Sequence, residues 1–259
     1  MKSSGTKKEA GKSLKKTFKA FAIQFETTDG QFERNYTKFL TFFNLCEKES
    51  LVVAPEVFPT GFFYSDMDLA SEFSKKVVDD IAKFSEGMSL TVVFTVIEKV
   101  NGKFFNSIKV IDRGKEVLSR PKVKLFPLTG ETEQFSAGDV SDLKVAETSC
   151  GVIAPVICFE LRYPEIFKLL KEMGAQVFAV SAQWGRARKE HWRVLTSARS
   201  IENQRFLVAS NGTGEMAGNS VIVDPWGRVL AQGGEAEGII SGKINLSVIE
   251  QVEKKLPME

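Results

Sequence analysis

The chain has 259 residues, 43% of them hydrophobic, which is enough for one large α/β core. Its net charge of +2 is concentrated in a lysine-rich N-terminus, so the remainder has no basic stripe of the kind that binds nucleic acid. The single histidine, His191, excludes a zinc site with three histidines, the three cysteines include no CxxC pair, and no apolar run is long enough to cross a membrane.

Residues 1–17 form a basic tail. They contain six lysines and one glutamate among serine, glycine and threonine, and this composition predicts a disordered segment that is either native or an expression remnant. No apolar segment of the signal-peptide type follows the tail, and the odd number and wide spacing of the cysteines indicate a reducing compartment. We therefore expect a cytoplasmic protein.

Apolar strand-like runs alternate with helical patterns along the rest of the chain, residues 18–259, without an interior linker. In chain order we expect strands at 18–25, 51–54, 90–97, 104–112, 116–118, 152–157, 177–181, 206–210, 220–223, 229–231 and 239–244, and helices at 32–49, 69–84, 164–173, 189–204 and 246–254. Each half combines crossover helices with late hairpins. This organisation predicts one α/β domain with mixed sheets.

Cys158 stands at the C-terminal end of the predicted strand 152–157, and Pro164 then suits the first turn of a helix. A strand that ends in a reactive side chain on a sharp turn into a helix is a recurrent way to expose a nucleophile. Free cysteines are also among the most frequently buried residues, so position alone favours a structural thiol equally.

Three charged residues lie in loops, two of them after strand-like runs. Glu56 has apolar neighbours, an environment that raises a carboxyl pKa and suits a base. Lys122 and Glu131, each taken alone, have the composition of exposed loops.

Together these segments resemble the nitrilase superfamily of carbon–nitrogen hydrolases. The resemblance rests on Pro-Glu-Val-Phe-Pro-Thr-Gly-Phe around Glu56, Lys-Val-Lys-Leu-Phe from Lys122 and Cys-Phe-Glu-Leu-Arg-Tyr-Pro-Glu from Cys158. The segments 198–204 and 218–227 also look like family segments. The resemblance covers nearly the whole chain except the tail, and it implies a four-layer α-β-β-α sandwich.

The resemblance also implies roles for individual residues. Cys158 matches the nucleophile, Glu56 the general base and Lys122 the cation that receives the oxyanion together with the backbone N–H of Phe159. Glu131 matches an additional family carboxylate.

Two neighbouring residues compete with these assignments. Glu133 is the rival of Glu131. Lys124 occupies a position that is often histidine in relatives, and Lys122 matches the catalytic position.

Further residues are candidates for binding substrate: Phe62, Glu133, Arg162, Gln183 and Trp184. For Arg162 a salt bridge to Glu160 or Glu165 is favoured over substrate binding. For Trp184 the alternatives are a place in the pocket wall and core packing. The pair His191-Trp192 resembles one in the omega-amidase-like branch, and we favour a structural role for it.

The expected reaction is hydrolysis of a small carboxamide by water through a thioester, with no metal or organic cofactor. The segments look closest to omega-amidase-like members that act on small dicarboxylic monoamides; nitrile and N-carbamoyl hydrolysis are the alternatives within the family. A redox-sensing thiol protein and an interaction scaffold are the alternatives of other classes. The resemblance implies a homodimer or a larger even assembly, without nucleic-acid or membrane partners.

Overall fold

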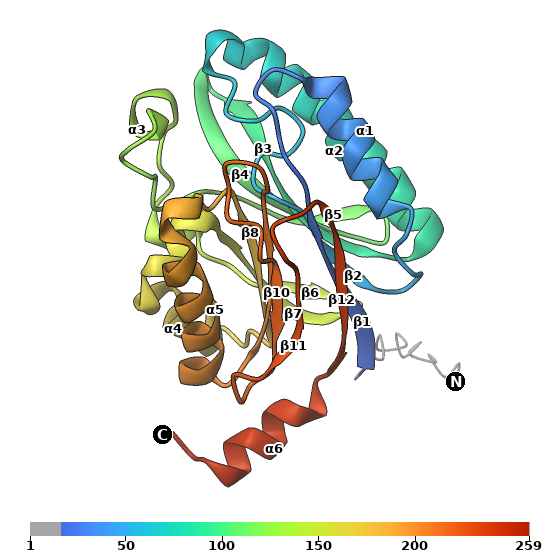
Figure 1. Ribbon diagram of the computed structural model, residues 1–259, viewed down its shortest axis with the longest axis vertical. Coiled ribbons are helices and arrows are strands. Elements are labelled where there is room, and N and C mark those ends of the chain that lie inside the picture. The colour runs from blue at the N-terminus through green and yellow to red at the C-terminus, as the bar shows by residue number, and fades with distance from the viewer. Residues whose placement is uncertain (1–16, 259) are drawn as a thin grey trace, which may run out of the picture.

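The computed structural model describes residues 17–258. The predicted disorder of residues 1–16 lies outside this range, whereas Thr17, which the sequence placed in the tail, is the first residue of a strand. The described chain forms two six-stranded sheets that face each other, with helices on both outer sides (Figure 1). This is the predicted four-layer α-β-β-α arrangement.

The two sheets have matching topologies. The first has the order β12 (Gly238–Asn245), β1 (Thr17–Gln24), β2 (Leu51–Val53), β3 (Thr91–Val100), β4 (Lys103–Asp112) and β5 (Lys115–Pro121). The second has the order β11 (Val229–Gln232), β10 (Val221–Val223), β9 (Phe206–Asn211), β8 (Val177–Ala182), β7 (Gly151–Ile157) and β6 (Ala146–Thr148). In each sheet three parallel strands have two antiparallel strands on one side and one on the other, so both sheets are mixed as predicted.

Helices α1 (Phe32–Phe43) and α2 (Met67–Met88) lie side by side over the first sheet, and α4 (Pro164–Glu172) and α5 (Lys189–Asn203) cover the second (Figure 1). The short α3 (Glu131–Gln134) and the C-terminal α6 (Ser247–Lys255) complete the α-helices of the described part. Four 3-10 helices are η1 (Tyr64–Asp66), η2 (Val140–Asp142), η3 (Cys158–Arg162) and η4 (Arg186–Arg188).

The strand period of two explains the layers. In β1, Ala20 and Ala22 belong to the core between the sheets, whereas Phe21 and Ile23 belong to the core beneath α1 and α2. Both faces of the central strands are therefore apolar, which is why these strands read as continuous hydrophobic runs.

Hydrogen bonds join the two sheets at the C-terminal ends of their parallel strands. Ser181 Oγ donates to the carbonyl of Ala54 over 2.8 Å, and the N–H of Glu56 donates to the carbonyl of Ala182 over 3.3 Å. Loops that leave both sheets consequently meet at one edge of the sandwich.

Some boundaries differ from the prediction. The first helix ends at Phe43 rather than residue 49, because the N–H groups of Leu45 and Cys46 bond back to Phe42 and Phe43 and tighten the last turn. β5 runs to Pro121 instead of ending at residue 118, because β4 pairs with it along that length. The short elements β6 and α3 were not predicted.

Candidate active site

Two of the predicted site residues stand at strained turns after parallel strands. Cys158 directly follows β7 with φ +38°, and Val57, the residue after Glu56, has φ +40°. Positive φ is uncommon for residues other than glycine, and for a β-branched residue such as valine it is an outlier. The hydroxyl of the buried Thr95 accepts the N–H of Val57 over 2.5 Å and thereby holds the second turn.

Lys122 joins two carboxylates in the interior. Its Nζ lies 2.7 Å from Oε1 of Glu56 and 2.7 and 2.9 Å from the two carboxylate oxygens of Glu131. All three side chains are about 1% exposed. The three N–H donors of the ammonium group match these three oxygens, so a further acceptor would have to replace or share one of the two contacts with Glu131.

Asn106, on β4, is a member of this cluster that the sequence analysis missed. Its Nδ2 donates to Glu56 over 2.8 Å and to Glu131 over 3.1 Å, and its backbone carbonyl accepts the N–H of Lys122 over 2.8 Å. No signal in the sequence singles it out, because β4 also contains the polar residues Ser107, Lys109 and Asp112.

Gln183, at the end of β8, connects the cluster to the second sheet. Its N–H donates to Oε2 of Glu56 over 3.1 Å. The thiol of Cys158 interacts with the Glu56 carboxylate and with the same N–H of Gln183. The structure therefore brings Glu56, Lys122, Glu131 and Cys158 into one hydrogen-bonded group.

Burial and neighbouring charges shift the pKa values of this group in opposite directions. Burial raises the pKa of Glu56; the Lys122 charge partly offsets this, and the Glu131 charge adds to it. Burial would lower the pKa of Lys122, but the charges of Glu56 and Glu131 outweigh it and raise that pKa. Burial and the Glu56 carboxylate raise the pKa of the Cys158 thiol, against the lowering effect of Lys122. The net result is a raised pKa for both the Cys158 thiol and the neighbouring Glu56 carboxyl.

The rivals of these residues lie elsewhere. Glu133 is exposed and is not among the residues that line the site cavity, and its contact with substrate stays a prediction. Lys124 places its ammonium 4.9 Å from the ring centre of Tyr163. Phe159 lies in the first turn of η3, where backbone N–H groups have no partner within the helix.

A cavity of about 620 Å³ opens onto Cys158, Glu56, Lys122 and Glu131. Its walls include the predicted Phe62 and Gln183. Tyr64 and Thr213, which the sequence analysis did not single out, also line it, and their hydroxyls are buried without a partner among the described residues. Buried hydroxyls are normally paired, so these two are available to a ligand.

A small side cavity next to Cys158 contains Arg162, Arg188 and Trp184. The Arg162 guanidinium lies 4.6 Å from the ring centre of Trp184, and the Arg188 guanidinium lies 5.0 Å from that of Phe126. Trp184 itself is 3% exposed and donates from Nε1 to the carbonyl of Arg188 over 2.8 Å. Trp184 therefore packs in the core and also lines the side cavity, and its contact with substrate stays a prediction.

The expected salt bridge of Arg162 is wrong. The carboxylate of Glu160 turns inward and binds Arg120 at 2.7 Å, whereas Nη2 of Arg162 lies 3.2 Å from Nδ1 of His191. No ion pair within residues 17–258 includes Arg162 or Arg188.

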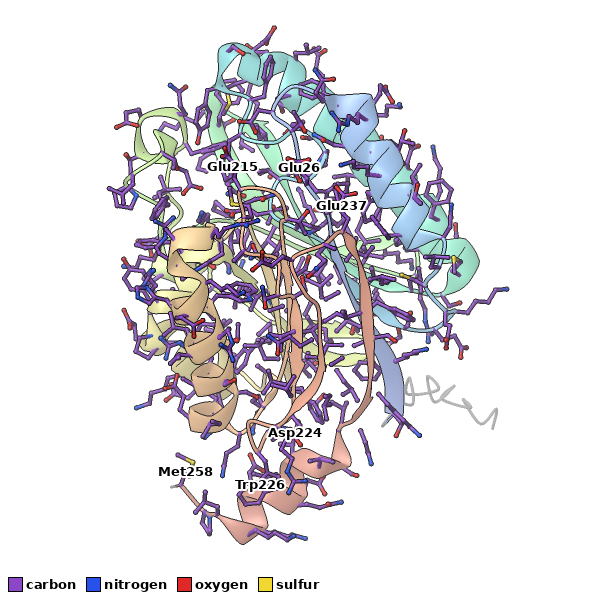
Figure 2. The ribbon with its side chains drawn as sticks, in the orientation of Figure 1. Glu26, Glu215, Asp224, Trp226, Glu237 and Met258 are labelled. Atoms are coloured by element: carbon purple, nitrogen blue, oxygen red, sulfur yellow. The ribbon has the colours of Figure 1, made fainter. Side chains whose placement is uncertain are left out.

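Three further acidic residues, Glu26, Asp29 and Glu215, line the main cavity, and Glu26 and Glu215 are labelled next to each other in Figure 2. The charge of Glu215 contributes to a raised pKa of Asp29, of which burial is the larger cause.

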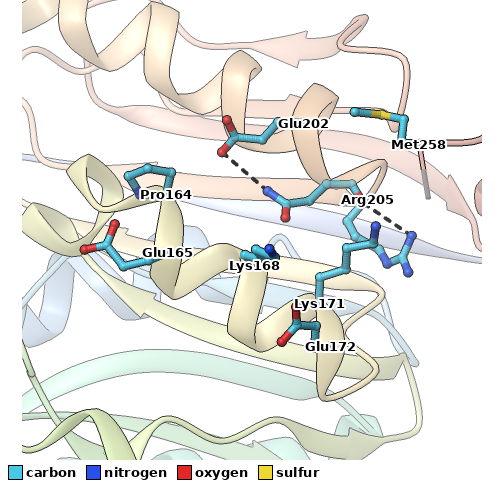
Figure 3. A pocket seen from close by; sticks show the side chains of 9 residues that line it. Pro164, Glu165, Lys168, Lys171, Glu172, Glu202, Arg205 and Met258 are labelled. Carbon is cyan, nitrogen blue, oxygen red and sulfur yellow. Dashed lines mark hydrogen bonds between the residues drawn. The ribbon is translucent and has the colours of Figure 1, made fainter.

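A separate groove of about 950 Å³ lies between α4, the end of α5 and the C-terminal segment (Figure 3). Its lining includes Lys168, Glu202, Arg205 and Met258, and none of the predicted site residues. The four predicted catalytic residues instead line the cavity of about 620 Å³ at Cys158.

The chain belongs to the carbon–nitrogen hydrolase family, whose profile matches residues 20–254. It is thus a carbon–nitrogen hydrolase, as the sequence predicted. It is 34% identical over 248 residues to 2-oxoglutaramate amidase of Bacillus subtilis (strain 168), an alignment that covers 91% of this chain and 94% of the relative. It is 29% identical over 230 residues to 2-oxoglutaramate amidase of Paenarthrobacter nicotinovorans, covering 82% and 77% of the two chains.

Solved structures agree in fold. Nit3 of Saccharomyces cerevisiae, a member of branch 10 of the nitrilase superfamily, superposes with a TM-score of 0.83 at 23% identity, covering 96% of this chain and 98% of that one. The predicted nitrilase-like fold is confirmed. None of the helices in residues 17–258 has the length and apolar character needed to cross a bilayer.

Proposed function

We propose that the protein hydrolyses a small carboxamide to an acid and ammonia, with Cys158 as nucleophile, Glu56 as proton carrier and Lys122 as oxyanion donor. The observation that carries this proposal is the bonded group of Cys158, Glu56 and Lys122 at the floor of a cavity. The amidase names of the relatives support the reaction class.

In the first half of the reaction Glu56 takes the proton of the Cys158 thiol while Sγ attacks the amide carbon. The carbonyl oxygen becomes an oxyanion that accepts hydrogen bonds from Lys122 Nζ and from the N–H of Phe159. Glu56 then gives the proton to the amide nitrogen, the C–N bond breaks, and ammonia leaves behind a thioester.

In the second half a water molecule gives one proton to Glu56 and attacks the thioester carbon. The C–S bond breaks, the acid leaves, and the proton returns to Cys158. Glu131 does not contact the thiol; it holds Lys122 in place through two short hydrogen bonds. The net reaction is amide plus water to acid plus ammonia.

We further propose that the acyl group carries a carboxylate. Arg188 lines both the main and the side cavity, Arg162 lines the side cavity, and neither has a carboxylate partner in residues 17–258. A guanidinium fork suits a carboxylate ligand. The hydroxyls of Tyr64 and Thr213 would serve a further oxygen of the acyl chain. The 2-oxoglutaramate amidase names of relatives support such an acidic amide.

A panel of small amides assayed for ammonia release tests the proposal. We expect succinamate, glutaramate and 2-oxoglutaramate to be hydrolysed with higher kcat/KM than the neutral butyramide. Arg188→Gln should remove this preference while the butyramide rate stays near that of the parent. Equal preference in parent and variant would sink the acidic-substrate assignment, and activity only on nitriles or carbamoyl compounds would replace the amide.

We also propose that the chain forms a homodimer in a reducing, cytoplasmic compartment. The outer face of α5 exposes Val194 and Ile201, which border a groove of about 500 Å³ together with Val229 of β11. Apolar side chains gathered along one surface commonly mark a protein interface. The three free cysteines fit the proposed compartment.

A further inference from the structure

A buried ion pair crosses from one sheet to the other directly behind the site. Arg120 is in β5 of the first sheet and Glu160 in η3 after β7 of the second, and their side chains are 1% and 0% exposed. The contact is bidentate: Nη1 lies 2.9 Å from Oε1 and Nη2 lies 2.7 Å from Oε2. Neither residue lines the cavities at Cys158.

The carboxylate of Glu160 also binds the backbone beside both reacting residues. Its Oε1 accepts the N–H of Val123 over 2.8 Å, and its Oε2 accepts the N–H of Ile157 over 2.8 Å. Val123 directly follows Lys122, and Ile157 directly precedes Cys158. One carboxylate therefore connects the chain segments that carry the cation and the thiol.

The guanidinium of Arg120 also binds backbone groups of both segments. Its Nη1 donates to the carbonyl of Pro121 over 3.0 Å, and its Nη2 donates to the carbonyl of Pro155 over 2.7 Å. Pro121 directly precedes Lys122, and Pro155 is in β7. The ion pair thus fixes the end of β5 to the end of β7 at four backbone points.

We propose that Arg120 and Glu160 are positioning residues for the reaction, which fix Lys122 at its working distance from Cys158. The inference rests on the proposed roles of these two residues. A buried ion pair is often replaceable by apolar side chains without loss of stability, so stability alone does not account for the pair. Its bonds to backbone groups on both sides of the site supply a geometric reason, because small displacements of reacting groups cost large factors in rate.

Glu160→Gln tests the proposal, because the amide nitrogen that replaces one carboxylate oxygen cannot accept from Val123 or Ile157. We expect kcat for the best amide to fall about 10- to 100-fold, the scale of a misplacement of about 1 Å, while KM stays near that of the parent. Arg120→Lys keeps the charge but loses the fork, and should give a smaller loss of the same kind. Glu253→Gln, which breaks the distant Arg205–Glu253 pair, is the matched control.

Iodoacetamide labelling of Cys158 against pH supplies a second measurement that needs no substrate. Lys122 lowers the thiol pKa, so its displacement should move the labelling midpoint to higher pH in Arg120→Lys, which leaves the charges of the pair unchanged, but not in Glu253→Gln. A lower melting temperature with unchanged kcat and unchanged midpoint would make the pair merely structural and overturn the proposal.

If Glu160→Gln does not fold, Arg120→Lys decides by the same two measurements, and parental values in it would also overturn the proposal. If the parent hydrolyses no amide but the variant still shows the midpoint shift relative to the parent, the proposed function is contradicted and the positioning role is retained.

Discussion

Cys158, Glu56 and Lys122 are buried and interact electrostatically with one another. In such a coupled group the removal of one member changes the titration of the others. The direction of each change follows from the sign of the charge removed. The Glu56 carboxylate holds the pKa of the thiol up, and the Lys122 ammonium holds it down.

Two substitutions should therefore move the labelling of Cys158 in opposite directions. Glu56→Gln removes a negative neighbour, so the midpoint of the pH profile of iodoacetamide labelling should fall. Lys122→Ala removes a positive neighbour, so that midpoint should rise. The measurement is the labelling rate between neutral and alkaline pH, read by intact mass. Shifts in the same direction, or none, would move the proton-carrying role away from Glu56.

The two nearby lysines should differ sharply in activity. Lys122→Ala should lower kcat about 10²- to 10³-fold, the usual scale for loss of an oxyanion donor. Lys124→Ala removes only a contact with the Tyr163 ring and should keep most of the rate. The measurement is steady-state ammonia release by both variants. The reverse order would place the lysine motif two residues out of register.

At this scale the sequence predicted the residues whose local motif is distinctive and missed those that depend on long-range contact. Cys158, Glu56, Lys122 and Glu131 were identified through a family resemblance, and the structure brings them together. Asn106 belongs to no recognised motif. It lies beside Lys122 only because β4 pairs with β5, and that pairing cannot be recognised from the residues next to Asn106.

The Arg162 prediction failed for a related reason. A neighbour in sequence was preferred as its partner, but Glu160 binds Arg120, a residue of the opposite sheet. The contact between sheets is not readable from local spacing.

The turns after β2 and β7 are the elements that present the reacting groups. Both hold a residue other than glycine at positive φ, and such strain persists only where the surrounding structure enforces it. Hydrogen bonds to buried partners supply that constraint for the turn at Glu56: Thr95 accepts the N–H of Val57, and Ala182 accepts the N–H of Glu56.

Thr95→Val should weaken this turn without changing the volume of the core. The N–H of Val57 would lose its acceptor in a fully buried site, which should cost about 1–3 kcal/mol of unfolding free energy. We expect kcat to fall as well, because Glu56 is no longer fixed. Urea unfolding and ammonia release measure the two effects. Thr41→Val, an exposed position on α1, is the control, and a Thr95→Val protein that matches it in both would contradict this role of the turn.

Secondary structure was largely predictable because strands and helices have strong apolar periods. Every predicted strand and helix is present, including the hairpin at Arg113-Gly114, where both residues have positive φ. The errors concern the ends of elements and the short elements. The apolar period of α1 continues in the sequence past Phe43, where the helix ends. The strand β6 has only three residues, which are too few to show a pattern.

On the scale of the whole molecule, the two sheets are covered on both sides, yet the outer face of α5 keeps apolar side chains in solvent. Val194 is 64% exposed and Ile201 is 49% exposed. They are seven residues apart, so both side chains lie on the same face of the helix. Ile201 also packs against Gly227 in the turn that precedes β11, so the apolar surface continues from the helix to the strand.

Ile201→Glu should separate the proposed dimer into single chains. The parent should sediment at about twice the chain mass of 28.8 kDa, because the apolar face is buried by a second copy. Leu69→Glu, at an exposed apolar position on α2, should leave the mass unchanged. Sedimentation equilibrium distinguishes these outcomes. A parent of single-chain mass would remove the dimer, and dissociation by Leu69→Glu instead would place the interface on the other helical layer.

The central claim is a covalent acyl intermediate on Cys158, and intact mass tests it most directly. The Glu56→Gln variant is mixed briefly with an activated ester of an acid whose amide the parent hydrolyses, and the mixture is then quenched in acid. The leaving group of such an ester needs no proton. Water attack requires Glu56, so the thioester should accumulate as a mass increment of one acyl group on the peptide with Cys158. Hydroxylamine should release it as a hydroxamate, and Cys158→Ala should show no increment. An increment on Cys46 or Cys150 instead, or acid production by Cys158→Ala at the parental rate, would contradict the account.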